Sequence, residues 1–270
     1  MNRPMLMAVL ACSVLVFGGV AVADVRLPSV IDSHMVLQRD MPLKIWGFAA
    51  RGEPVMVELA GAKATATANG KGEWAVTLPA MKAGGPHTMT IAGNNKISLT
   101  DILVGEVWIG SGQSNMQWSV SASNNAGAEI GAAKYPNIRL FLVPNVLSGI
   151  PNKDVKADWK ACTPAAVPPF SAVLYFFGRH LHKELGIPIG LIASSWGGSL
   201  IEPWTPPPGF AGVKKVKGIS DTVRTTQVAY LEALGKSPAS STPEAKAWLA
   251  EALAAAKKDE LVPPAPALAL

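Results

Sequence analysis

Two adjoining stretches decide the fold: Asp101–Gly110 reads DILVGEVWIG, and Gly110–Trp118 reads GSGQSNMQW. The first is apolar and nearly continuous, which is typical of a parallel strand buried on both faces. The second is rich in glycine and serine and begins where that strand would end. In open α/β sheets, ligands and reactive groups lie at the carboxyl ends of the strands. The pair therefore predicts an α/β domain with a candidate site just after residue 110.

The following sequence supports this fold. Arg139–Val143 (RLFLV) and Gly190–Ala193 (GLIA) are similar apolar runs. Between them, Ser171–Gly186 (SAVLYFFGRHLHKELG) has apolar residues at helical spacing, with a serine suited to cap its start and a glycine suited to stop it. A strand, a helix and a second strand form a βαβ unit, which predicts a parallel sheet with helices outside it.

Before residue 101 the apolar residues follow a different pattern. Short β-rich runs such as Pro42–Ala49 and Pro54–Gly61 recur, bounded by glycine, proline and charged residues. An Asn69-Gly70 step lies between two alternating runs and predicts a hairpin there. Strands at this spacing favour a small antiparallel β-sandwich. Near the other end, Thr242-Pro243-Glu244 has the residues of a helix start.

The amino terminus has the pattern of a secretory signal peptide. Arg3 precedes a long uncharged apolar run, and Ala21-Val22-Ala23 supplies small residues at a cleavage site. The alternative is an uncleaved anchor helix, because the run approaches bilayer length. We expect cleavage before Asp24, a secreted or periplasmic protein and no stable membrane span afterwards. Only Cys162 would then remain, so no intrachain disulfide can form, and we expect it to be a small buried side chain.

Composition narrows the classes of function. Hydrophobic residues make up 49% of the 270-residue chain and charged residues 16%, which excludes an intrinsically disordered protein. The formal charge is +5 without a dense basic run. This argues against nucleic acid as a partner.

Two loops are candidates for chemistry. Ser114 would be lifted out of the glycine-rich turn at a helix start, where backbone N–H groups can hold an oxyanion. Ser194–Ser199 (SSWGGS) would follow the neighbouring parallel strand, so both loops would face one crevice. The alternatives are a plain loop in which Ser114 caps a helix, and a tight turn with structural tryptophans. The first loop is also not G-x-S-x-G, so the usual α/β-hydrolase elbow does not fit.

Five stretches together resemble the sialate O-acetylesterases, a family of the SGNH-hydrolase superfamily. They are GSGQSNMQW (Gly110–Trp118), SSWGGSLIEPW (Ser194–Trp204), Asp32–Val55, Pro169–Ile192 and the turn Gly70–Trp74. They occur in the family's order, and a Gly-Gln-Ser-Asn-Met run with a later Trp-Gly-Gly-Ser is a specific combination.

This resemblance implies a β-sandwich followed by an SGNH-type three-layer α/β/α domain, here incomplete. Ser114 matches the family nucleophile, and its own N–H with one from Gly197-Gly198 would form part of the oxyanion hole. The other residues expected to touch the sugar are Gln113, Asn115, Trp196, Glu202 and Trp204. The implied reaction removes an O-acetyl group from sialic acid or a related sugar through an acetyl-enzyme. No metal or organic cofactor is implied.

The chain departs from the family in lacking a base for the serine. The family takes a histidine from an Asp-x-x-His segment near its C-terminus and uses a Gln-Gly-Glu-like loop, and neither occurs here. His180 and His182 lie on the predicted helix and are more typical of surface residues. The sequence therefore indicates a truncated chain that would be nearly inactive alone.

The predicted organisation has four parts. These are a signal peptide over 1–23, a β-sandwich over 24–100, the first part of an SGNH-like domain over 101–210, and a helical or low-order segment over 211–270. The predicted function is a secreted carbohydrate O-acetylesterase. The alternatives are a non-catalytic carbohydrate-binding protein, or an acetyl esterase on another glycan such as acetylxylan. The oligomeric state stays open.

Overall fold

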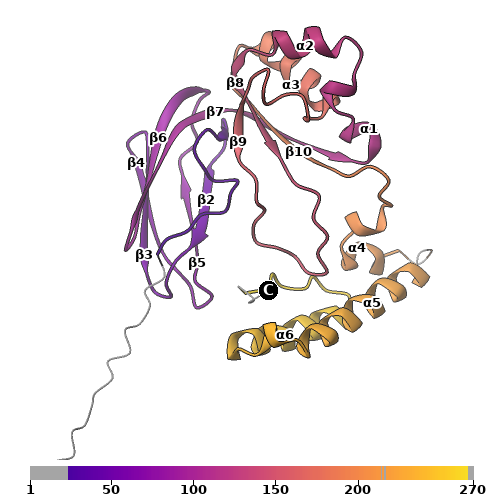
Figure 1. Ribbon diagram of the computed structural model, residues 1–270. Coiled ribbons are helices and arrows are strands. Elements are labelled where there is room, and N and C mark those ends of the chain that lie inside the picture. The colour runs from indigo at the N-terminus through magenta and orange to yellow at the C-terminus, as the bar shows by residue number, and fades with distance from the viewer. Residues whose placement is uncertain (1–23, 214, 216, 267–270) are drawn as a thin grey trace, which may run out of the picture.

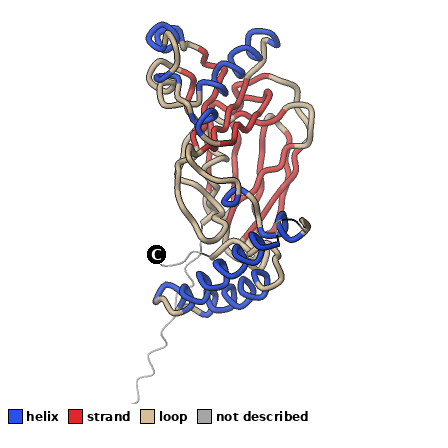
Figure 2. The backbone as a smooth tube through the Cα atoms, turned by 90° about the vertical axis from the view of Figure 1, so that its right-hand side faces the viewer, coloured by secondary structure: helices blue, strands red, loops and turns tan. Residues whose placement is uncertain are grey.

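The computed structural model describes residues 24–213, 215 and 217–266, so the predicted signal peptide lies outside the described residues. The strands are β1 (Val36–Gln38), β2 (Leu43–Phe48), β3 (Pro54–Leu59), β4 (Ala62–Thr67), β5 (Glu73–Leu78), β6 (Gly84–Ala92), β7 (Lys96–Gly112), β8 (Tyr135–Leu142), β9 (Trp159–Cys162) and β10 (Ile189–Ser195). The helices are α1 (Ser114–Gln117), α2 (Ala126–Ala132), α3 (Ala172–Leu185), α4 (Pro207–Ala211), α5 (Lys217–Gly235) and α6 (Pro243–Ala256). Figure 2 shows the helices gathered toward two ends of the molecule with strands between them.

The amino-terminal strands form a sandwich of two sheets. One has the order β4-β3-β6-β7, with β1 also paired to β7, and the other is the antiparallel pair β2-β5. Alternate side chains along these strands, such as Ile45, Val57 and Ile91, are fully buried between the sheets. The hairpin predicted at Asn69-Gly70 is wrong, because β4 pairs with β3 and β5 pairs with β2. The turn instead carries the chain from one sheet to the other, and the Asn69 side chain accepts hydrogen bonds from the N–H groups of Lys71 and Glu73.

Strand β7 joins the sandwich to the second sheet (Figure 1). Its first part pairs antiparallel with β6 through Val104, and its last part, from Glu106 to Gly112, pairs parallel with β10. The sequence predicted a division at residue 101, but one strand continues through it. Its middle part, Ile102–Val104, is fully buried, where the strand passes from one sheet to the other. Beyond it β7 pairs, among the described strands, with β10 alone and forms an edge, and Trp108 and Ile109 are 43% and 69% exposed, so the burial predicted through residue 110 is wrong for this last part. At the crossing, a Cβ on Gly105 would lie 1.9 Å from the carbonyl oxygen of Pro188.

We therefore expect Gly105→Ala to destabilise the protein strongly. Overpacking typically costs about 1–3 kcal/mol, and a backbone carbonyl cannot rotate away as a side chain can, so we expect the upper end of that range. Urea unfolding followed by circular dichroism measures the change. Gly127→Ala is the control, because its added Cβ would lie in open space on α2. Alanine is favoured over glycine inside a helix, so this variant should raise the free energy of unfolding by about 0.5 kcal/mol. An unchanged midpoint for Gly105→Ala would show that the two segments are not in contact.

The α/β part confirms the predicted βαβ unit. Its strands have the order β7-β10-β8-β9, with β7, β10 and β8 parallel. Helix α3 lies between β8 and β10 in sequence. The Ser171 hydroxyl accepts from Leu174 N at its start, and Gly186 ends it with φ of 66°. A Cβ on Gly178 would lie 2.5 Å from a methyl of Leu191, so this glycine lets α3 pack closely on the sheet. The antiparallel edge strand β9, only four residues long, was not predicted.

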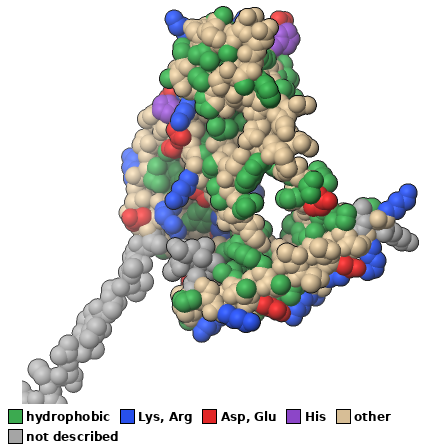
Figure 3. All heavy atoms as spheres, turned by 45° about the vertical axis from the view of Figure 1, so that its right-hand side comes forward, with side chains coloured by type: hydrophobic (Ala, Val, Ile, Leu, Met, Phe, Trp, Pro, Cys, Tyr) green, Lys and Arg blue, Asp and Glu red, His purple; other side chains and the backbone are tan. Residues whose placement is uncertain are grey.

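The last helices form a separate layer. Helix α6 begins at the predicted proline, and the Thr242 hydroxyl accepts from Ala245 N. Its partner α5 was not predicted, because only Ser220 and Leu231 of this helix are fully buried. The two helices share a small core that includes Leu231, Trp248 and Ala252. Figure 3 shows an opening through the molecule between this layer and the α/β part. Among the described helices, none has the length and apolar character needed to cross a bilayer.

Candidate active site

Ser114 lies at the carboxyl end of β7. The strand ends at Gly112, whose φ of 146° is open to glycine and rarely to other residues. Ser114 is the first residue of α1, and its side chain is exposed. A cavity of about 450 Å³ lies beside it, lined by Gln113, Ser114, Asn115, Met116 and Val173. The predicted residues Gln113 and Asn115 are therefore beside the serine. Met116 and Val173 were missed, although Val173 follows the predicted helix cap.

The second glycine-rich loop meets the first at this serine. Strands β7 and β10 are parallel neighbours, and Ser195 is in register with Gly112. Trp196 N donates to Gly112 O over 2.9 Å. A Cβ on Gly197 would lie 3.4 Å from Ser114 Oγ. The two loops thus meet as predicted, with a glycine directly beside the candidate nucleophile, but no residue of the second loop lines the cavity.

The two backbone donors predicted on the second loop differ in availability. Gly197 N donates to the Gln117 side-chain oxygen over 2.6 Å, so this N–H is occupied. Gly198 has a φ of 75°, and its N–H donates no hydrogen bond within the described part of the chain. Gln117 was not predicted as a site residue, although it lies in the quoted motif. Its side chain ties the two loops together.

The remaining predicted residues lie along the second loop. Trp204 Nε1 donates to Ser199 Oγ over 2.8 Å, and Ser199 Oγ donates to Trp196 O over 2.7 Å. Glu202 begins the short 3-10 turn Glu202–Trp204. Trp196, Glu202 and Trp204 are not among the residues that line the cavity beside Ser114. They form an ordered loop next to it rather than its wall.

No described histidine serves as a base for Ser114. Val173 at the start of α3 borders the cavity. His180 and His182 follow seven and nine residues later, roughly 10–13 Å along the helix axis. His182 Nδ1 contacts Ile187 O at 2.7 Å. Ser114 Oγ makes no hydrogen bond to any described residue, as a serine without its base should.

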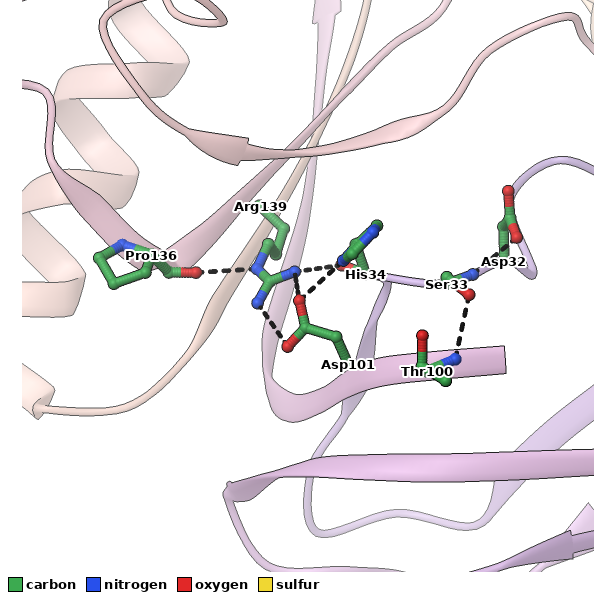
Figure 4. Close-up of polar contacts among 7 residues, drawn as sticks. All are labelled: Asp32, Ser33, His34, Thr100, Asp101, Pro136 and Arg139. Carbon is green, nitrogen blue, oxygen red and sulfur yellow. Dashed lines mark hydrogen bonds and ion pairs between the residues drawn. The ribbon is translucent and has the colours of Figure 1, made fainter. Parts of the chain in front are cut away.

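A histidine–aspartate pair does exist elsewhere, as Figure 4 shows. His34 Nδ1 lies 2.7 Å from Asp101 Oδ2. Asp101 also accepts two hydrogen bonds from the Arg139 guanidinium, at 2.6 and 3.0 Å. Arg139 is only 4% exposed, and its hydrogen bonds lower the pKa of Asp101 below the usual range, with His34 adding to the effect. Asp101 precedes Gly112 by roughly 36 Å of extended strand, so this cluster joins the sandwich to β8 and cannot serve Ser114.

Cys162 is a free, fully buried thiol on β9, as the sequence predicted. Burial raises its pKa to about 11. A thiol in this state is a poor nucleophile at neutral pH. Within residues 24–266, leaving out 214 and 216, no three His, Cys, Asp or Glu side chains are grouped so as to hold a metal ion.

A parallel α/β sheet with an exposed serine at a strand end, preceded by a small β-sandwich, places the chain in the SGNH-like fold class expected from the sequence. A solved structure with this architecture is a carbohydrate acetylesterase from Xanthomonas citri. It is 37% identical to the chain and superimposes with a TM-score of 0.67, over 71% of this chain and 45% of that one.

Curated relatives agree with that match. The chain is 37% identical over 201 residues to the sialate O-acetylesterase of Mus musculus and 38% identical to that of Homo sapiens. The aligned part is 67% of this chain and 37% of the mouse protein. No family model matches the chain. Over the aligned part, the chain is therefore a homologue of the sialate O-acetylesterases, and it spans well under half of their length.

Proposed function

We propose that the chain carries the nucleophile half of a secreted carbohydrate O-acetylesterase that acts on sialic acid or related sugars. The observation that carries this proposal is the contact between the two loops, which places Gly197 directly beside the exposed hydroxyl of Ser114. Cleavage of a signal peptide before Asp24 is part of the same proposal. The substrate class follows the names of the relatives, an acetylesterase of carbohydrates and the sialate O-acetylesterases.

The proposed reaction has two steps. Ser114 Oγ attacks the acetyl carbonyl carbon, and its proton passes to a base. The oxyanion is held by the N–H groups of Ser114 and Gly198, and the sugar oxygen then leaves with a proton. Water next attacks the acetyl-enzyme and releases acetate. Gln113 and Asn115 border the cavity that would receive the ester.

The base must come from polypeptide other than the described residues. A serine hydroxyl is a weak nucleophile at neutral pH without an adjacent base. None of His34, His180 and His182 is placed to act on Ser114. His87 lies on β6 of the sandwich, in register with Ile102, which precedes Gly112 by roughly 33 Å of extended strand. We therefore propose that the complete site includes a further segment, corresponding to the length of the relatives that this chain does not match.

Expression of the gene together with its downstream region tests this function. Acetate release is measured from O-acetylated sialic acid and from acetylated xylo-oligosaccharides. We expect the sialic acid ester to react faster, and Ser114→Ala to lower its rate at least 10³-fold, because the nucleophile is lost. Faster release from the xylo-oligosaccharides would instead assign the site to another glycan. Full activity in Ser114→Ala would exclude Ser114 as nucleophile.

A further inference from the structure

A second hollow lies on the sandwich, away from Ser114. It has a volume of about 650 Å³ and is lined by residues of β2, β5 and the end of β4, together with Asn69 and Lys153. Figure 1 shows β2 and β5 in the sandwich, whereas α1 lies on the far side of the α/β part. The lining residues used below are Lys44, Trp46, Phe48, Thr67, Asn69, Glu73, Trp74 and Lys153. We call this hollow the sandwich groove.

Aromatic side chains supply its apolar surface. Trp46 and Phe48 alternate with inward residues on β2 and so share its outer face. Trp46 is 38% exposed, so part of its ring is open to a ligand. The C–H face of a pyranose ring packs well on such a flat aromatic surface. The groove thus has the kind of platform that a sugar ring occupies.

Most of its polar groups already have partners, and one buried donor does not. Trp74 is only 3% exposed, yet its Nε1 has no hydrogen-bond partner among the described residues. Buried donors are nearly always paired, so an unpaired one indicates a missing acceptor. Asn69 uses its side-chain oxygen on backbone N–H groups, and its side chain also hydrogen-bonds to the Glu73 carboxylate.

The charged side chains of the groove favour a ligand with a negative charge. Lys153 Nζ pairs with Glu73 over 2.8 Å and lies 5.6 Å from the centre of the Phe48 ring. The Glu73 carboxylate is therefore neutralised within the groove. Lys44 is exposed and makes no ion pair with any described residue. The net charge of the lining is thus positive, and it resides on a lysine beside the aromatic platform.

We propose that the sandwich groove binds an acidic saccharide, with the sugar ring on Trp46 and its carboxylate at Lys44. The Thr67 hydroxyl lies at the same rim. This site is separate from the esterase site. It would hold a carboxylate-bearing glycan on the protein independently of any reaction at Ser114.

Ligand-observed NMR with the full chain tests the proposal. The probe is the methyl glycoside of N-acetylneuraminic acid, compared with its methyl ester, which has the same ring without the charge. We expect the acid to bind and the ester to bind at least fivefold more weakly. Trp46→Ala should weaken binding of the acid at least tenfold. Lys44→Gln should weaken the acid without changing the ester.

Matched controls separate this site from others. Trp108→Ala removes an equally exposed tryptophan on β7, and Lys96→Gln removes an exposed lysine on the sandwich; neither should change binding. Ser114→Ala should also bind normally, so failure of the esterase proposal would not mimic failure here. Thermal unfolding checks that each variant is folded. Absence of binding, equal binding of acid and ester, or wild-type binding in both Trp46→Ala and Lys44→Gln would overturn the proposal.

Discussion

Purified chain is expected to hydrolyse 4-nitrophenyl acetate about 10⁴–10⁶-fold more slowly than the Xanthomonas citri acetylesterase, measured by release of 4-nitrophenolate under the same conditions. In serine hydrolases, removal of triad members lowers kcat by about this factor. The described chain has the exposed serine but no histidine within reach of its hydroxyl. The cavity and the Gly198 N–H would supply only the binding and part of the oxyanion stabilisation that remain in such enzymes.

Ser114→Ala provides the control for this rate. Because the serine is unactivated, its loss should change the small residual rate by less than about tenfold. Rapid turnover that disappears in Ser114→Ala would contradict the prediction. It would mean that a base among the present residues reaches the serine in solution.

The second large effect concerns stability. Asp101→Ala should destabilise the protein by about 3 kcal/mol, measured by urea unfolding. Breaking a buried ion pair costs about 3–5 kcal/mol, because a charge is left buried without compensation. We expect the lower end, since the Asp101 side chain is 36% exposed whereas that of Arg139 is 5% exposed. His34 would also lose its partner.

Asp40→Ala is a matched control. Asp40 has a φ of 59°, close to the 56° of Asp101, so alanine suffers the same backbone strain at both positions. Its partner Lys82 is 90% exposed, however, and the pair is screened by water. We expect Asp40→Ala to unfold close to wild type. Equal effects of the two substitutions would show that strain, and not the buried guanidinium, sets the cost.

The same aspartate gives a pH dependence. Its folded-state pKa is lowered, so its contribution to stability is complete above the unfolded value of about 3.9. The contribution is lost as the pH falls from about 3.9 through the lower pKa that Asp101 has in the folded state. The difference in free energy of unfolding between the wild-type protein and Asp101→Ala should therefore become smaller in acid. A difference in stability that did not shrink as the pH fell below about 3.9 would contradict the ion pair as its source.

Much of the architecture could be predicted from local signals. The caps Ser171 and Thr242 marked the starts of α3 and α6, because their hydroxyls bond to N–H groups that a helix leaves free. The apolar runs at 139–143 and 190–193 are parallel neighbours, as buried strands joined by a helix should be. The meeting of Ser114 and Gly197 follows from the register of β7 and β10, which two adjoining strand ends impose.

Other features depend on contacts that no local pattern reveals. The Asn69-Gly70 turn looked like a hairpin, but pairing was decided by which side chains the two sheets bury together. Strand β7 continues past Asp101 because its backbone pairs first with β6 and β1 and then with β10, which begins only at Ile189 in the sequence. The occupied N–H of Gly197 depends on Gln117, whose position is fixed only when α1 packs beside the second loop. Helix α5 buries little of its surface, so its sequence carries a weak periodic signal.

The proposed division of the esterase site is tested most directly by the DNA sequence that follows the codon for Leu270, read in all three frames. We expect a frame that continues and encodes a Gln-Gly-Glu loop followed by an Asp-x-x-His segment, which would supply the base that Ser114 lacks. A stop codon followed by unrelated sequence in every frame would contradict that proposal. It would favour the non-catalytic role, in which the chain binds carbohydrate without cleaving an ester.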